Sequence, residues 1–216
     1  MNPNIELWHD IALIKDDKYF TRWIKQEGRL DHHLGFLEFL KPYLHGVMLD
    51  VGGNIGTHSI YYSKFGHVHS FEPNPIAFEC LVHNMQGTNS TLYNVAVGAE
   101  SGYISMTTPE NGNYGAVYTQ PHGEIPVITI DSMQLDACDF IKIDVEGDEV
   151  AVLQGAAETI KKFKPTMCIE SNPCTLVRKG LTANDLVAAI HLLGYTTKQR
   201  VPLDISCDLL CFPPGR

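Results

Sequence analysis

The sequence predicts an α/β fold around a mostly parallel sheet, and three observations lead to this prediction. From residue 46 onward, short apolar runs alternate with helix-compatible segments, the pattern of strands joined by crossover helices. A glycine-rich turn follows the first run directly, after Asp50. The second run ends at another carboxylate, Glu72, at the distance typical of a nucleoside-binding βαβ unit.

The apolar and helical segments alternate in a regular order. We predict strands near residues 47–51, 67–71, 91–95, 139–144 and 166–171. We predict helices near residues 55–65, 75–85 and 148–163, with Gly155 bending or dividing the last one. Two further strands, Tyr103–Thr107 and Ile125–Ile130, flank the polar loop Pro109–Gly115. This part is an insertion of hairpin character, and the loop is either an ordinary surface turn or a cover for the sheet edge.

The two ends of the chain follow other patterns. Residues 1–45 are predicted to form an N-terminal helical appendage, because apolar side chains recur at helical spacing around Trp23 and Leu37. Residues 46–216 then form one globular domain. At its end, Ala183–Leu193 is expected to be a helix, followed by an antiparallel pair of strands, Tyr195–Val201 and Ser206–Phe212.

The glycine spacing bears on the type of nucleoside. The turn has the pattern D-x-G-x-x-x-G and lacks the G-x-G-x-x-G register that seats a dinucleotide pyrophosphate. A ligand with a ribose but no phosphate, such as S-adenosylmethionine, suits this turn better than NAD. The alternative is a tight turn whose glycines serve only close packing.

A second unusual passage follows the predicted strand 139–144. Lys142, Asp144 and Glu146 alternate with apolar residues, so they share one face of an extended strand. The two carboxylates fall at the carboxyl end, where open α/β sheets bind ligands. Lys142 either keeps one of them ionised for function or forms a purely structural ion pair. Asp148 and Glu149 are expected to open the next helix.

Composition and charge limit the classes of partner that we expect. The chain has 216 residues and a formal net charge of −9, which disfavours nucleic acid as a partner. No cysteine pair forms C-x-x-C, the N-terminus lacks the features of a signal peptide, and no apolar run has the length of a membrane span. We therefore expect a cytoplasmic protein with reduced thiols and no membrane association.

With these motifs in hand, the chain resembles the FkbM family of S-adenosylmethionine-dependent methyltransferases. The resemblance covers about residues 46–172 and is carried by four motifs: Leu49–Gly56, Phe71–Pro75, Asn94–Gly98 and Ile141–Gly147. It departs at Gly53, where the family usually has Ala. It implies a class I methyltransferase fold, Rossmann-like, with a seven-stranded, mostly parallel sheet and an antiparallel last strand.

The resemblance also implies site residues. By position, Glu72, with Pro73 beside it, would hold the ribose of the cofactor, and the segment from Asn94 to Ala96 would border the adenine. Asp144 would face the cofactor amine or the acceptor. The methionine part would lie against the first motif, at Asp50, Gly52, Gly53, Asn54 and Gly56.

The expected reaction is O-methylation of a small hydroxylated acceptor, with a sugar as one candidate. The candidates for the base that takes the hydroxyl proton are Glu146, Asp144 and His58. Glu170 and Asn172 are candidates for acceptor binding. No metal is assigned, although Asp144, Glu146 and Glu170 leave a metal-assisted methyltransferase open. A scaffold that binds the nucleoside without catalysis is the other alternative.

Overall fold

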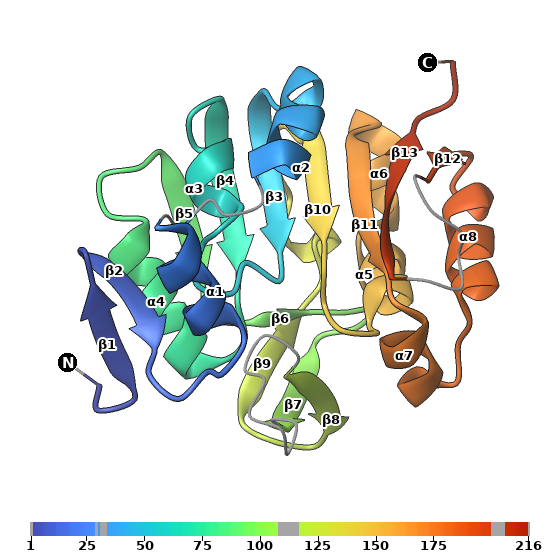
Figure 1. The fold of residues 1–216 in the computed structure, drawn as a ribbon. Helices are drawn as coiled ribbons and strands as arrows, with labels where there is room; N and C mark the ends of the chain where they lie inside the picture. The colour runs from blue at the N-terminus through green and yellow to red at the C-terminus, as the bar shows by residue number, and fades with distance from the viewer. Residues whose placement is uncertain (1, 29, 31–33, 108–116, 200–205, 216) are drawn as a thin grey trace.

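A central sheet of seven strands organises the described residues of the computed structural model, which are 2–28, 30, 34–107, 117–199 and 206–215. The strand order is β12–β13–β11–β10–β3–β4–β5 (Figure 1). The bounds are β3 (Gly46–Val51), β4 (Gly66–Phe71), β5 (Ser90–Tyr93), β10 (Phe140–Ile143), β11 (Thr166–Ser171), β12 (Thr196–Lys198) and β13 (Cys207–Phe212). From β11 to β5 every neighbouring pair is parallel, whereas β13 is antiparallel to β11 and β12. The predicted α/β class with an antiparallel last strand is confirmed.

Helices cover both faces of this sheet because side chains alternate along each strand. Ile141 and Ile143 enter a core with helices α5 (Glu149–Gly155), α6 (Ala157–Phe163) and α8 (Ala183–Leu192). Phe140, on the other face, packs with α2 (Leu34–Leu40) and α3 (Ser59–Tyr62). No helix in the described ranges combines the length and apolar character needed to span a membrane.

The predicted helix over 148–163 is divided into α5 and α6. Its division follows Gly155, where an added Cβ would lie 1.9 Å from the backbone oxygen of Gly98. Glycine is therefore required there by the close approach of another chain segment. The predicted helix at 55–65 is shorter than expected, because the residues before Ser59 form the turn that follows β3.

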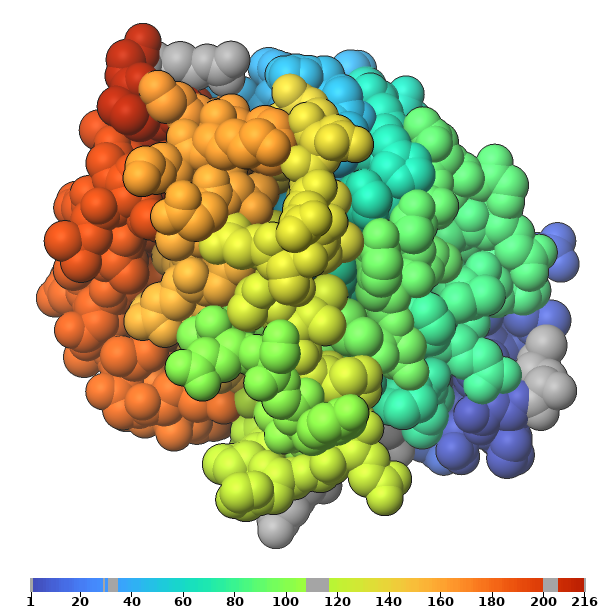
Figure 2. Space-filling model, turned by 180° about the vertical axis from the view of Figure 1, so that it is seen from behind, coloured from blue at the N-terminus to red at the C-terminus, as the bar shows by residue number. Residues whose placement is uncertain are grey.

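The predicted insertion forms a small second sheet with the order β6–β9–β7–β8. Its strands are β6 (Ala96–Val97), β7 (Gly102–Thr107), β8 (Tyr118–Pro121) and β9 (Ile125–Ile128). The arrows of β3, β4 and β10 point toward it in Figure 1, so it lies below the carboxyl edge of the main sheet. From behind, β7 and its neighbours project from the lower part of the molecule (Figure 2). The predicted loop Pro109–Gly115 lies outside the described residues.

The N-terminal appendage is only partly helical, which corrects the prediction for residues 1–45. Helices α1 (Phe20–Glu27) and α2 are present, but a β-hairpin of β1 (Ile5–Trp8) and β2 (Ile11–Ile14) precedes them. Its turn places His9 and Asp10 at φ of 47° and 65°. Two-residue hairpin turns with positive φ at both residues usually contain glycine, and the turn of His9 and Asp10 contains none.

The hairpin is fastened to helix α4 (Pro75–Asn84). Asn84 accepts a hydrogen bond from the backbone N–H of Ala12 at 2.8 Å and donates to the Ala12 oxygen at 3.0 Å. It also donates to the oxygen of Ile55, in the turn after β3, at 2.8 Å. The N-terminal segment is thereby tied to the turn that the sequence singled out.

Candidate active site

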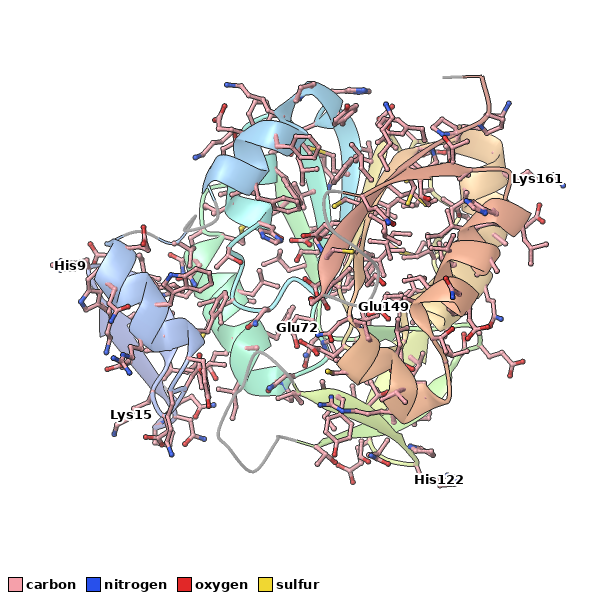
Figure 3. The ribbon with its side chains drawn as sticks, turned by 45° about the vertical axis from the view of Figure 1, so that its right-hand side comes forward. His9, Lys15, Glu72, His122, Glu149 and Lys161 are labelled. Carbon is pink, nitrogen blue, oxygen red and sulfur yellow. The ribbon has the colours of Figure 1, made fainter. Side chains whose placement is uncertain are left out.

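A cavity of about 630 Å³ lies at the carboxyl edge of the main sheet, and strands β6, β7 and β8 of the small sheet contribute to its lining. Its lining comes from the turns after β3, β4 and β10, from the carboxyl end of β11, from β6–β8, and from the start of α1. Figure 3 places Glu72 near the middle of the molecule, whereas His9, Lys15, His122 and Lys161 lie at its periphery. A pocket at this edge is where open α/β sheets bind ligands. Of the predicted site residues, these line it: Gly52, Gly53, Asn54, His58, Glu72, Pro73, Ala96, Asp144, Glu146 and Glu170.

The glycine turn is held against strand β4. The backbone N–H groups of Gly52 and Gly53 both donate to the oxygen of Phe71, at 3.0 and 2.9 Å. Gly52 has a φ of +92°, and a Cβ on it would lie 1.8 Å from the backbone oxygen of Asp144. A Cβ on Gly53 would lie 2.1 Å from the Ser70 hydroxyl oxygen. Close packing thus accounts for both glycines, and it also brings their backbone to the cavity wall.

Glu72 presents a nearly buried carboxylate to the cavity, with 7% of the residue exposed. One oxygen accepts from the backbone N–H of Asn54 at 2.9 Å, and the other accepts from that of Asn74 at 2.7 Å. Burial raises the pKa of Glu72 to about 7, and the two hydrogen bonds oppose this rise. Each oxygen still has a lone pair for a ligand hydroxyl.

Asn54 supplies a second polar group. Its backbone has a φ of 48°, in the left-handed region that asparagine tolerates better than most residues. Its side-chain oxygen is buried and has no hydrogen-bond partner among the residues that the structure describes. Because a buried acceptor without a donor is costly, this oxygen suits a ligand that donates a hydrogen bond, such as an ammonium or a hydroxyl.

Three predicted cofactor-binding residues, Asp50, Asn94 and Gly56, are not among the residues that line the cavity. Asp50 is 1% exposed and accepts a hydrogen bond from the Ser59 hydroxyl at 2.5 Å. Asn94 donates to the backbone oxygens of Glu72 and Pro73, at 2.8 and 3.2 Å. These contacts hold the turns after β3 and β4 from behind the cavity.

Lys142 is a buried ammonium with two carboxylate partners. It lies 3.2 Å from an oxygen of Asp144 and 3.0 Å from an oxygen of Asp208, and it is 1% exposed. Burial alone would raise the pKa of Asp144, but the charges of Lys142 and His58, together with hydrogen bonds from Lys142 and Glu170, outweigh it and the pKa is lowered. Asp144 is therefore held ionised at the cavity wall. The structural and functional interpretations of Lys142 are thus compatible.

Glu146 and Glu170 behave in the opposite way. Burial, reinforced by the negative charge of Asp144, raises the pKa of Glu146 to about 8 and also raises that of Glu170. Glu146 has a φ of 57°, which turns the chain out of the extended strand after β10. Among the described residues, Asp144, Glu146 and Glu170 each offer a carboxylate oxygen within 4.8 Å of the others. The cluster can hold a proton, and its oxygen ligands also suit a divalent cation.

His58 and Asn172 complete the predicted set. His58 lines the cavity at the start of α3, and its ring centroid lies 6.0 Å from those of Phe36 and Tyr62. Asn172 does not line the cavity; it caps helix α7 (Pro173–Leu176) by accepting from the N–H of Cys174.

Asp148 and Glu149 differ from simple helix caps. Asp148 makes no side-chain cap; it lines the cavity, pairs with Lys179 at 2.9 Å and accepts from the Thr119 hydroxyl. Glu149 is fully buried and accepts from the backbone N–H of Gly147 at 3.0 Å. It therefore supports the bend that carries Glu146.

Sequence reasoning missed the contribution of the N-terminal segment to the site. Tyr19, Phe20 and Trp23 line the cavity from α1. Their helical spacing was visible, but it predicts only an amphipathic helix. The sequence feature that could have indicated this contribution is the cluster of three aromatic side chains within five residues.

Comparison with known proteins identifies the family of this chain. A family model described as methyltransferase FkbM domain matches residues 50–196, more than half of the chain. Hexuronic acid methyltransferase AglP from Haloferax volcanii is 32% identical over 123 residues. That match covers 53% of this chain and 52% of the relative, so the chain spans about half the length of the curated relative it matches.

Solved structures agree on the fold. Methyltransferase FkbM from Methylobacillus flagellatus KT has a TM-score of 0.55 and 21% identity, and the match covers 77% of this chain and 43% of that one. Magnesium protoporphyrin IX methyltransferase from Synechocystis PCC 6803, solved with bound S-adenosylmethionine, has a TM-score of 0.50 and 12% identity, covering 91% and 84%. The match over residues 50–196 shows that the chain belongs to the methyltransferase FkbM family, and this membership and fold support S-adenosylmethionine as its cofactor.

Proposed function

We propose that this chain transfers a methyl group from S-adenosylmethionine to a hydroxyl of a small acceptor, and that the acceptor is a sugar. The observation that carries the proposal is one cavity with two kinds of polar group. Glu72 and the unpartnered oxygen of Asn54 suit a ribose and an amine, and the cluster around Glu146 suits proton transfer. The hexuronic acid methyltransferase relative supports the sugar class.

The residues present fit the cofactor. When bound, its sulfonium supplies an electrophilic methyl group. Glu72 would accept from ribose hydroxyls, because each of its oxygens uses only one backbone donor. Asn54 and the ionised Asp144 would receive the amine, and Ala96 and Pro73 line the cavity where an adenine would lie.

Among the base candidates, Glu146 fits best. A general base works best with a pKa near the working pH, and the pKa of Glu146 is raised to about 8. Asp144 is a weaker base because Lys142 lowers its pKa. As the acceptor oxygen forms its bond to the methyl carbon and the carbon–sulfur bond breaks, Glu146 would take the hydroxyl proton. Glu146 would lose its negative charge in the same step in which the sulfonium charge is lost, so the step is balanced in charge.

The test is methyl transfer from radiolabelled S-adenosylmethionine to a panel of neutral and acidic sugars and other small alcohols. The proposal expects label in an alkali-stable methyl ether of a sugar. Label recovered as an alkali-labile methyl ester would refute hydroxyl methylation. Cofactor binding without transfer to any acceptor would instead favour the non-catalytic scaffold.

The carboxylate cluster favours a second candidate, a metal-assisted version of the same reaction. A divalent cation bound there would lower the pKa of the acceptor hydroxyl. Activity that is lost on treatment with EDTA and regained with Mg²⁺ or Mn²⁺ would support this version. Unchanged activity after EDTA treatment would leave Glu146 as the base without a metal.

A further inference from the structure

Helix α1 presents aromatic side chains to the cavity. Tyr19, at the N-cap, and Trp23, one turn later, both line it, with Phe20 between them. Tyr19 is 53% exposed and Trp23 is 41% exposed. Large aromatic side chains that remain this exposed beside a cavity of ligand size mark a binding surface more often than chance exposure.

Tyr19, Phe20 and Trp23, called the aromatic wall below, stand on a firmly held stretch of backbone. The Asp17 carboxylate accepts from the backbone N–H groups of Tyr19 and Thr21, at 3.1 and 2.9 Å. The Thr21 hydroxyl donates to the backbone oxygen of Ile14 at 2.9 Å, which ties the start of α1 to strand β2. Ile24, fully buried, belongs to the same core cluster as residues of α4 and of the glycine turn. The wall therefore needs little ordering when a ligand arrives.

The cavity lining along the sheet edge has two characters. Helix α1 packs in one core cluster with α4, the helix that follows β4, whereas the carboxylates of Asp144, Glu146 and Glu170 come from the ends of β10 and β11, on the other side of β3 in the sheet order. The lining on the α1 side is thus aromatic, with the single carboxylate of Glu72 beside it, and the other side carries a cluster of three carboxyl groups.

We propose that Tyr19 and Trp23 form the acceptor subsite and that this subsite binds a pyranose ring. A pyranose has an apolar face of C–H bonds, which stacks on an aromatic ring, and hydroxyl groups around its edge, which carboxylates bind. The two-sided lining matches this chemistry, while a flat aromatic acceptor would leave the carboxylates unpaired. The inference deepens the proposed function and rests on it for the methyl-transfer step, but the binding is separately testable.

The probes are the methyl pyranosides of glucose, galactose, mannose and glucuronic acid, each at millimolar concentration with saturating S-adenosylhomocysteine. Saturation-transfer NMR should show contacts to ring C–H protons of at least one probe. Trp23→Ala should weaken that binding by about tenfold, and Trp23→Phe should retain most of it. The matched control is Tyr103→Ala, because Tyr103 is 68% exposed but lies outside the cavity lining.

Tryptophan emission gives an independent readout. The chain has two tryptophans, so Trp8→Phe leaves Trp23 as the sole reporter. The bound pyranoside should change its emission in the presence of S-adenosylhomocysteine. If Trp23→Ala does not fold, Tyr19→Ala takes its place in the NMR experiment.

Three results would overturn the inference: no pyranoside binds, binding is unchanged in Trp23→Ala and Tyr19→Ala, or these variants lose S-adenosylhomocysteine affinity while keeping the sugar. The last result would assign the wall to the cofactor. Failure of the proposed function differs, because pyranoside binding would then persist in a protein that transfers no methyl group.

Discussion

The carboxylate of Glu72 accepts a hydrogen bond of 2.9 Å from the backbone N–H of Asn54, and this bond joins the turns after β3 and β4. The two residues lie in the turns that follow the neighbouring parallel strands β3 and β4, and they are 18 positions apart in the chain. Both line the cavity, and both keep unused acceptor capacity. The pair is therefore the structural centre of the proposed cofactor site.

Asp50 is predicted to position the glycine turn without touching the cofactor. Asp50→Ala removes the carboxylate acceptor of the buried Ser59 hydroxyl, which then keeps only the Ser70 hydroxyl at 2.9 Å, and should lower the free energy of unfolding by about 1–3 kcal/mol. Asp50→Asn keeps an acceptor for that hydroxyl and should retain cofactor affinity. Urea unfolding and calorimetric titration with S-adenosylhomocysteine measure the two effects. A large loss of affinity in a stably folded Asp50→Asn protein would show direct contact.

Glu146→Gln should abolish most turnover while sparing cofactor binding. The loss should be about 10²–10⁴-fold, the usual contribution of general base catalysis. In the wild type, kcat/KM should rise with pH up to about 8, because the base acts only when deprotonated. A Glu146→Gln enzyme with normal turnover and an unchanged pH profile would remove Glu146 from the mechanism and leave Asp144 and His58 as candidates.

The unliganded protein should lose stability as pH rises from about 5 to about 8. The pKa values of Glu72 and Glu146 are raised to about 7 and about 8, so the folded chain holds protons that the unfolded chain releases. This stabilising contribution is complete below the unfolded pKa and is lost through the folded one. For Glu72, whose pKa rises from its ordinary value of 4.5 to about 7, it amounts to about 3 kcal/mol, and urea unfolding at several pH values measures it.

A cationic ligand should offset this loss. S-adenosylmethionine or another cationic analogue favours the ionised carboxylates, so its stabilising effect should grow with pH more than that of neutral-sulfur S-adenosylhomocysteine. The same pH dependence for both ligands would mean that the carboxyl groups with raised pKa values do not face the sulfonium.

The sequence predicted the elements whose signals are local. Strands β3, β4 and β11 follow from apolar runs, and Gly52 marks the turn because only a residue without Cβ fits there. It could not predict contacts made by distant segments. Asp208 reaches Lys142 only because β13 pairs with β11, and Trp23 reaches the cavity only because α1 packs on α4.

The same reason explains why some residues that were assigned to the site from their motif position do not line the cavity. Asp50 and Asn94 each precede a residue that lines the cavity, Val51 and Val95. Their own side chains, however, form hydrogen bonds with protein groups behind the cavity. Position along a strand predicts which end a residue occupies. Which partner its side chain finds depends on the neighbouring strands and turns.

The most direct test of the account is calorimetric titration of S-adenosylhomocysteine into the wild type, Glu72→Gln and the control Glu100→Gln, whose glutamate is exposed. Losing a charge-assisted acceptor for ribose hydroxyls should weaken binding by about tenfold or more in Glu72→Gln only. Equal affinity of all three folded proteins would contradict a cofactor site centred on Glu72 and Asn54.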